Sequence, residues 1–165
     1  MHRRKPVHKE TRVGADDVVI GFKPRDELAV AAEVLQAAKK PLIVAGGGVL
    51  YSGASEELDR FVQATGIPVC ETQGGKSALS DEHGLNMAAV GVTGTAAANR
   101  LAEEADVVLA VGTRLQDFTT GSWALFKNPD KVIVGLNTQV FDATKHRAIP
   151  LVADARVGLE ELSAN

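Results

Sequence analysis

The sequence predicts an α/β fold of the three-layer, Rossmann-like kind: a doubly wound parallel six-stranded sheet with helices on both faces. Short, continuous apolar runs, typical of strands buried on both faces, alternate with stretches of helical periodicity. Most of these runs end in small or polar residues, as the turns of such a sheet do. Because strands that alternate with helices form parallel sheets, we expect one such domain over residues 25–165.

The first expected helix covers residues 25–40, where apolar side chains recur at spacings of three and four and form one face. Lys39 and Lys40 are expected to close this helix, and Pro41 prevents its continuation. The apolar run PLIVA at 41–45 follows as a strand buried on both faces.

Three consecutive glycines at 46–48 form the turn after this strand. Ser52 or Ser55 is placed to cap the next expected helix, 55–65, which Gly66 ends. A strand, a glycine turn and a helix form the unit at which open α/β sheets hold anions and nucleotides. This stretch is therefore the centre of the predicted fold.

The remaining elements continue the alternation. Thr95 is expected to cap the helix that follows it. The central strand should be 42–45 or 107–111, because both runs are apolar on both faces. The further expected elements are strands at 68–71, 85–90, 107–111, 131–136 and 149–152, and helices at 96–104 and 155–163.

Composition excludes several classes of function. A net charge of −3 and an aromatic content of 4% offer neither a basic surface nor stacking platforms for nucleic acid. No apolar run is long enough to span a membrane, and the single cysteine, Cys70, is typical of a reducing compartment. We expect a cytoplasmic protein without a membrane partner, in which residues 1–24 form a charged linker arm.

A dinucleotide-binding fingerprint is only partly present. Gly46 and Gly48 fit Gly-x-Gly-x-x-Gly, but Tyr51 stands at the third glycine position. Glu71 ends a predicted strand near the place where an acid would bind the ribose of NAD. An ordinary NAD-binding unit stays open as a minor alternative.

Other catalytic motifs are incomplete. Gly75-Lys76-Ser77 resembles the end of a phosphate-binding loop, but Cys70 stands where that pattern needs its first glycine. Cys70 itself reads as a small core residue. No catalytic residue and no metal ligand is predicted, and four histidines without metal-ligand spacing are read as surface residues: His2, His8, His83 and His146.

The ends of the predicted strands are more informative. Their small polar loops should gather at the carboxyl edge of one sheet, where such folds bind ligands, and their N–H groups would attract an anion or a diphosphate. Arg114 would reinforce that attraction, unless it pairs with Asp117 or Asp154. The other interpretation is that the glycines only make tight turns. The candidate cofactor-binding residues are Gly46, Gly47, Gly48, Thr72, Gln73, Gly91, Thr93, Gly112, Arg114, Asp117 and Asn137.

Residues 27–162 resemble the central domain of thiamine-diphosphate-dependent enzymes, the group that includes acetohydroxyacid synthase. The segments that carry the resemblance include KPLIVAGGGVLYSGA, TGIPVCETQGGKSAL and LVADARVGLEEL. Within that group, ETQGGKSAL, GVTGTAAAN and TRLQDFTTGS are most similar to the enzymes of inositol catabolism that hydrolyse a carbon–carbon bond of a cyclic 1,2-dione.

The resemblance implies a parent enzyme of three domains. In that family a C-terminal domain with a Gly-Asp-Gly…Asn motif holds thiamine diphosphate and Mg²⁺, and an N-terminal domain carries the activating glutamate. No Gly-Asp-Gly occurs in this sequence. The chain is therefore expected to be an excised middle domain that binds no cofactor and has no activity alone. Its expected partners are the flanking domains, in a homo-oligomer.

The flavin-binding relatives in this group carry an acidic residue and an arginine in the stretch that corresponds to Gln116 and Phe118. The resemblance therefore implies the flavin fold with weakened flavin contacts. Two alternatives stay open: the central domain of acetohydroxyacid synthase or a related decarboxylase, and a free-standing nucleotide-binding module.

Overall fold

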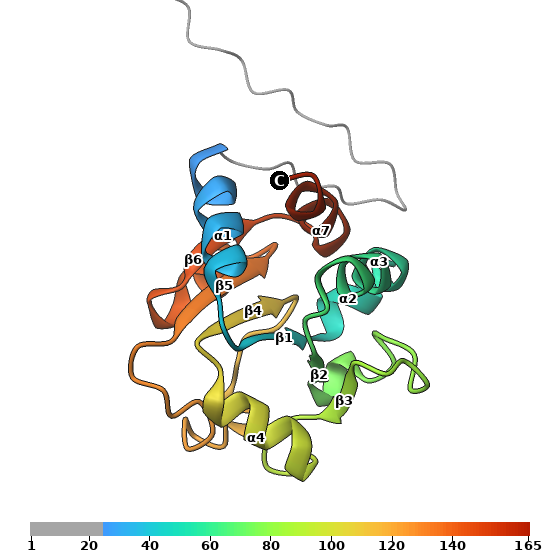
Figure 1. Ribbon diagram of the computed structural model, residues 1–165, viewed down its shortest axis with the longest axis vertical. Helices are drawn as coiled ribbons and strands as arrows, with labels where there is room; N and C mark the ends of the chain where they lie inside the picture. The colour runs from blue at the N-terminus through green and yellow to red at the C-terminus, as the bar shows by residue number, and fades with distance from the viewer. Residues whose placement is uncertain (1–24) are drawn as a thin grey trace, which may run out of the picture.

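A computed structural model describes residues 25–165, which form one open sheet between two layers of helices (Figure 1). All strand pairings are parallel, as predicted, and the strand order is β3-β2-β1-β4-β5-β6. The predicted arm, residues 1–24, lies outside the described residues together with His2 and His8. The strands are β1 (Pro41–Ala45), β2 (Val69–Glu71), β3 (Asn86–Ala89), β4 (Val107–Val111), β5 (Val132–Asn137) and β6 (Ile149–Val152).

The two strands predicted as central, β1 and β4, pair with each other in the middle of the sheet. Every residue of β4 is buried, and so is every residue of β1 after Pro41. The chain builds outward from β1 to β2 and β3, and from β4 to β5 and β6. The order of strands therefore reverses between β1 and β4, and in open α/β sheets a crevice forms at such a point.

Helices α1, α3 and α7 cover one face of the sheet, and α4 covers the other (Figure 1). No helix among residues 25–165 has the length and apolar character needed to cross a membrane. The helices are α1 (Arg25–Ala37), α2 (Gly47–Tyr51), α3 (Ser55–Thr65), α4 (Ala96–Glu104), α5 (Asp117–Thr120), α6 (Val140–Thr144) and α7 (Ala155–Ser163), with 3-10 turns at Gln73–Gly75 and Lys145–Arg147.

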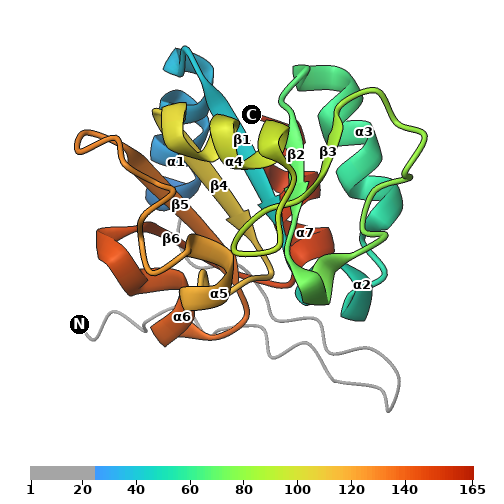
Figure 2. The ribbon, with the colours of Figure 1, turned by 90° about the horizontal axis from the view of Figure 1, so that it is seen from below.

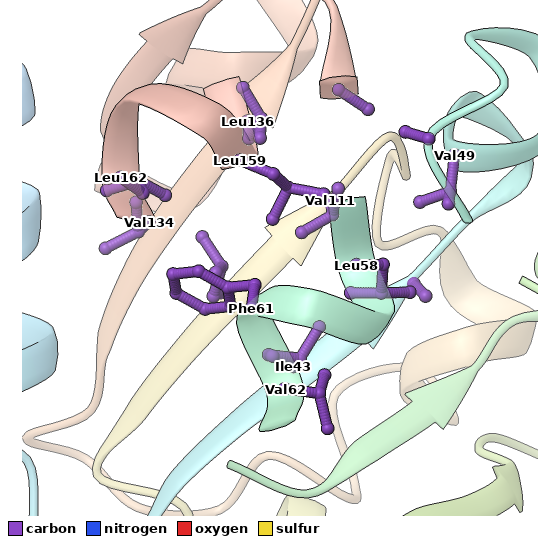
Figure 3. Close-up of a cluster of buried hydrophobic side chains, with 14 of the residues drawn as sticks. Ile43, Val49, Leu58, Phe61, Val62, Val111, Val134, Leu136, Leu159 and Leu162 are labelled. Carbon is purple, nitrogen blue, oxygen red and sulfur yellow. The ribbon is translucent and has the colours of Figure 1, made fainter. Parts of the chain in front are cut away.

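Alternating side chains of the strands fill two cores. Ile43 of β1 faces α3 and α7, whereas Leu42 and Val44 face the side of α4. Figure 3 shows the first core, where Phe61 of α3 and Leu159 of α7 converge on the sheet. Both faces of the central strands are thus apolar and covered, which explains their continuous hydrophobic runs.

Cys70 is fully buried in the core on the side of α4, as predicted. Burial, and to a lesser degree the charge of Glu71, raises the pKa of its thiol to about 12. His146 is exposed, as expected for a surface residue, whereas His83 is half-buried. The Nδ1 atom of His83 accepts a hydrogen bond from the backbone N–H of Leu85 (3.1 Å), so it orders a turn.

Several predicted helix ends need correction. Helix α1 ends at Ala37, so Lys39 and Lys40 lie beyond it. Their backbone N–H groups donate to the carboxylate of Asp106 at 2.8 and 2.9 Å, and this contact turns the chain into β1.

The cap of α3 was also wrongly predicted, because Ala54 occupies the N-cap and Ser52 instead closes the preceding helix. Two other predictions are confirmed. Gly66 ends α3 in the left-handed conformation, and the Thr95 hydroxyl accepts a hydrogen bond from the N–H of Ala98 (3.1 Å).

Candidate functional site

A cleft of about 470 Å³ lies at the carboxyl edge of the sheet, where β1 and β4 end side by side. Figure 2 shows the short helices α2, α5 and α6 at this edge, beyond the arrowheads of the central strands. The position agrees with the prediction that the strand-end loops gather at this edge, and it lies where the order of strands reverses. Seven of the eleven candidate residues line the cleft: Gly47, Gly48, Thr72, Gln73, Gly112, Arg114 and Asn137.

The other four candidates lie elsewhere along this edge. Gly46 is the N-cap of α2. Gly91 and Thr93 belong to the loop between β3 and α4. Asp117 lines a neighbouring hollow of about 550 Å³, to which Arg114 also contributes. The predicted set is therefore close together in the fold, but only part of it surrounds one space.

The glycines allow two turns to pack against each other. A Cβ atom on Gly48 would lie 2.6 Å from the Cα of Gly112, and one on Gly46 would lie 2.6 Å from the Cβ of Thr113. Gly112 also adopts a positive φ of 58°. Gly46, Gly48 and Gly112 must be glycines because the two turns approach each other closely there. This agrees with the alternative interpretation that the glycines make tight turns.

Several of the expected anion-binding amides are already occupied. The N–H groups of Gly46 and Gly48 donate to the carbonyls of Val111 (2.8 Å) and Gly112 (3.0 Å). The N–H of Gly112 donates to the carbonyl of Leu136 (2.8 Å), and the N–H of Gly91 donates to the side-chain oxygen of Asn99 (2.9 Å). These four amides are not free donors, so anion binding at this edge stays a prediction for the other loop amides.

The polar side chains of the cleft divide into fixed and free groups. Asn137 is fixed, because its Nδ2 donates to the carbonyl of Thr113 (3.2 Å) and its Oδ1 accepts from the N–H of Gln139 (3.0 Å). Asp142 pairs with Lys145 at 2.8 Å. Arg114 is exposed, and within the described part of the chain it pairs with neither Asp117 nor Asp154. It is therefore the available cation of the cleft.

Glu71 cannot act as a ribose-binding acid in this conformation. Its side chain is buried, with 2% of the residue exposed, and it does not line the cleft. Its Oε1 accepts a hydrogen bond from the N–H of Leu79 (3.1 Å), which holds the loop after β2. Lys76 of the phosphate-loop-like segment faces Asp81 at 3.6 Å, away from the cleft.

Sequence reasoning missed several residues of the cleft. Tyr51 was noted only as a departure from the glycine fingerprint, yet it is 95% exposed and lines the opening. Gln139 and Asp142 were not identified because no helix was predicted between the last two strands, where the structure has α6. Five residues between two strands give too little periodicity to predict such a helix.

No metal centre emerges from the described residues, since no three His, Cys, Asp or Glu side chains gather there as ligands. The cleft itself offers one cation, exposed aromatic side chains and several amides. This chemistry suits binding or packing more than it suits proton transfer or nucleophilic attack.

Comparison with known proteins gives a consistent result. Residues 28–162 match the family described as thiamine pyrophosphate enzyme, central domain. A 3D-(3,5/4)-trihydroxycyclohexane-1,2-dione hydrolase of Clostridium perfringens is 44% identical over 161 residues, which cover 98% of this chain and 24% of that protein. Proteins with the same name in Clostridium tetani and, as hydrolase 2, in Bacillus cereus are each 47% identical, over 81% and 82% of this chain and 21% of each relative. The chain therefore spans less than a quarter of the length of these relatives.

Proposed function

The chain belongs to the thiamine pyrophosphate enzyme family as a central domain, and from this premise we propose that it is the central domain of a cyclic 1,2-dione hydrolase. The observation that carries the proposal is the identity of 44–47% to relatives that are all named as trihydroxycyclohexanedione hydrolases. Such an enzyme would break one carbon–carbon bond of the ring with water, as a step of myo-inositol catabolism.

The proposal places catalysis in other domains of a parent enzyme. Thiamine diphosphate supplies a stabilised carbanion in this type of chemistry, and it requires a bound Mg²⁺. The described residues do not fit that pair, because they bring no metal ligands together and the sequence has no Gly-Asp-Gly. We therefore assign no catalytic step to this chain, and we expect the 165-residue chain to be inactive alone.

The role proposed for this chain is that of a scaffold. Its cleft keeps the position at which related folds hold nucleotides, but the amides of Gly46, Gly48 and Gly112 are used for hydrogen bonds within the domain. Gln116 and Phe118 line the cleft where the flavin-binding relatives are expected to carry charged residues. An uncharged pair at these positions supports a cleft that holds no flavin.

The proposed setting is a cytoplasmic homo-oligomer, built with the flanking domains of the same enzyme. A buried free cysteine and a net charge of −3 are consistent with this setting.

An activity assay on the full-length enzyme tests the proposal. With thiamine diphosphate and Mg²⁺ present, the enzyme should hydrolyse the cyclic trihydroxy-1,2-dione and should not form acetolactate from pyruvate. Acetolactate formation without turnover of the dione would favour the acetohydroxyacid synthase alternative. Titration of the 165-residue chain with NAD, FAD and ADP tests the third alternative, because micromolar binding would identify a nucleotide-binding module.

A further inference from the structure

Exposed apolar side chains concentrate at one edge of the domain. Of the seven large hydrophobic residues exposed among the described residues, six lie in the loops and short helices that come after the carboxyl ends of β1, β3, β4 and β5, and the seventh, Val30, lies in α1. We call these six the apolar rim. They are Leu50, Tyr51, Val92, Phe118, Val140 and Phe141.

Two members of the apolar rim line the cleft, and others lie next to residues that line it. Tyr51 and Phe118 both line it, and the N–H of Val92 donates to the carbonyl of Phe118 (3.0 Å). Phe141 adjoins the cleft-lining Asp142 in α6, and the Nζ atom of Lys145 lies 4.7 Å from its ring centroid. Figure 2 shows α2, α5 and α6, which carry five of the six residues, along the same edge.

Single exposed apolar residues are normal on protein surfaces, but their collection at one edge needs an explanation. Phe141 is 74% exposed and Val92 is 65% exposed, so neither serves the core. Arg114 lies within the same edge as an exposed cation without an ion pair in the described part of the chain. Apolar contact area around a charged group is typical of a protein–protein interface.

We infer that the apolar rim is the face on which another domain of the same enzyme docks. This inference rests on the proposed function, since it requires flanking domains. The chain spans less than a quarter of its relatives and matches a domain described as central, so those longer proteins contain other domains that need a contact surface. The docking surface should present apolar side chains and a carboxylate opposite Arg114.

Hydrogen exchange measures this contact without substrate. The amides of residues 91–94, α5 and α6 should exchange more slowly in the full-length enzyme than in the 165-residue chain. The amides of α1, which carries no part of the rim, should change less. Equal exchange of the rim in both proteins would overturn the inference. Protection that instead rises with the concentration of the 165-residue chain would identify a second copy as the occupant.

Charged substitutions provide the second readout. Val92→Glu and Phe141→Glu should leave the melting temperature of the 165-residue chain unchanged and lower that of the full-length enzyme by several degrees. Val30→Glu is the matched control, an exposed apolar residue away from the rim, and it should affect neither. Equal melting of all three full-length variants would contradict docking at the rim. Both readouts are independent of turnover, so they stand even if the enzyme proves to act on another substrate.

Discussion

Asn99 holds Gly91 through two hydrogen bonds: its Oδ1 accepts from the N–H of Gly91 (2.9 Å), and its Nδ2 donates to the carbonyl of Gly91 (3.0 Å). Gly91 is buried at a φ of 115°, and a Cβ atom there would lie 3.0 Å from the Cα of Thr119. An amide side chain in α4 thus fixes the loop that packs on α5.

Asn99→Ala should therefore destabilise the domain. It leaves the N–H of the buried Gly91 without its partner, which costs about 1–3 kcal/mol, whereas the Gly91 carbonyl still accepts from the N–H of Gly94 (2.9 Å). Urea denaturation monitored by circular dichroism measures the loss. Arg100→Ala on the same helix is the control, because it removes only an exposed ion pair with Glu104 and should cost clearly less than Asn99→Ala. Equal losses in both variants would contradict this role for Asn99.

Gly48→Ala tests the close approach of the two turns. The added methyl group would meet the backbone of Gly112, which cannot rotate away, so we expect a loss of about 1–3 kcal/mol or more in unfolding free energy. Gly84→Ala is the matched control, since an added Cβ there meets no atom within 4 Å. A Gly48→Ala variant as stable as the control would show that the turns have room.

Asp106→Asn tests the junction between α1 and β1. Burial tends to raise the pKa of the Asp106 carboxyl. Hydrogen bonds from the backbone N–H groups of Lys39, Lys40, Asp106 and Val107 outweigh burial, so the pKa lies below its ordinary value of 3.8. The folded state thus favours the charged form. The added stability is present above the unfolded pKa and is lost as the pH falls through the lower folded value.

Urea denaturation of the wild type and Asp106→Asn between pH 7 and pH 2 should show this dependence. The wild type should be the more stable protein near neutral pH, and its advantage should shrink below about pH 4. An advantage that stays constant or grows as the pH falls would contradict the assigned pKa direction.

Cys70 should be unreactive in the folded protein. Its thiol is buried and has a pKa of about 12, so almost no thiolate exists at pH 8. Ellman's reagent should label the chain only after denaturation, with one thiol per molecule. Rapid labelling of the native protein would indicate that the core around β2 opens readily.

The fold could be predicted from the sequence because its signals are local and strong. The apolar runs at β1 and β4 are continuous, and the helices between strands carry clear apolar faces, so the central strands and the parallel sheet were both predicted correctly. Strand ends in a parallel sheet gather at one edge, which placed seven candidates in one cleft.

The details of the candidate site could not be predicted, because most of them depend on contacts between segments that are distant in the sequence. Whether a glycine amide is free depends on what packs against it, and the partner of Gly48 lies 64 residues away at Gly112. The same holds for Glu71, whose buried hydrogen bond to Leu79 has no signature in the sequence. Short helices such as α2 and α6 are set by the turn geometry after a strand, so periodicity does not reveal them.

The most direct test of the account is the flavin content of this chain, because the central claim is that the cleft serves as a scaffold without a flavin. The 165-residue chain is purified, incubated with excess FAD, desalted, and examined by visible absorbance and flavin fluorescence. The account predicts a colourless protein without flavin emission. A stoichiometric yellow protein would contradict it and assign the chain to the flavin-binding branch of the family.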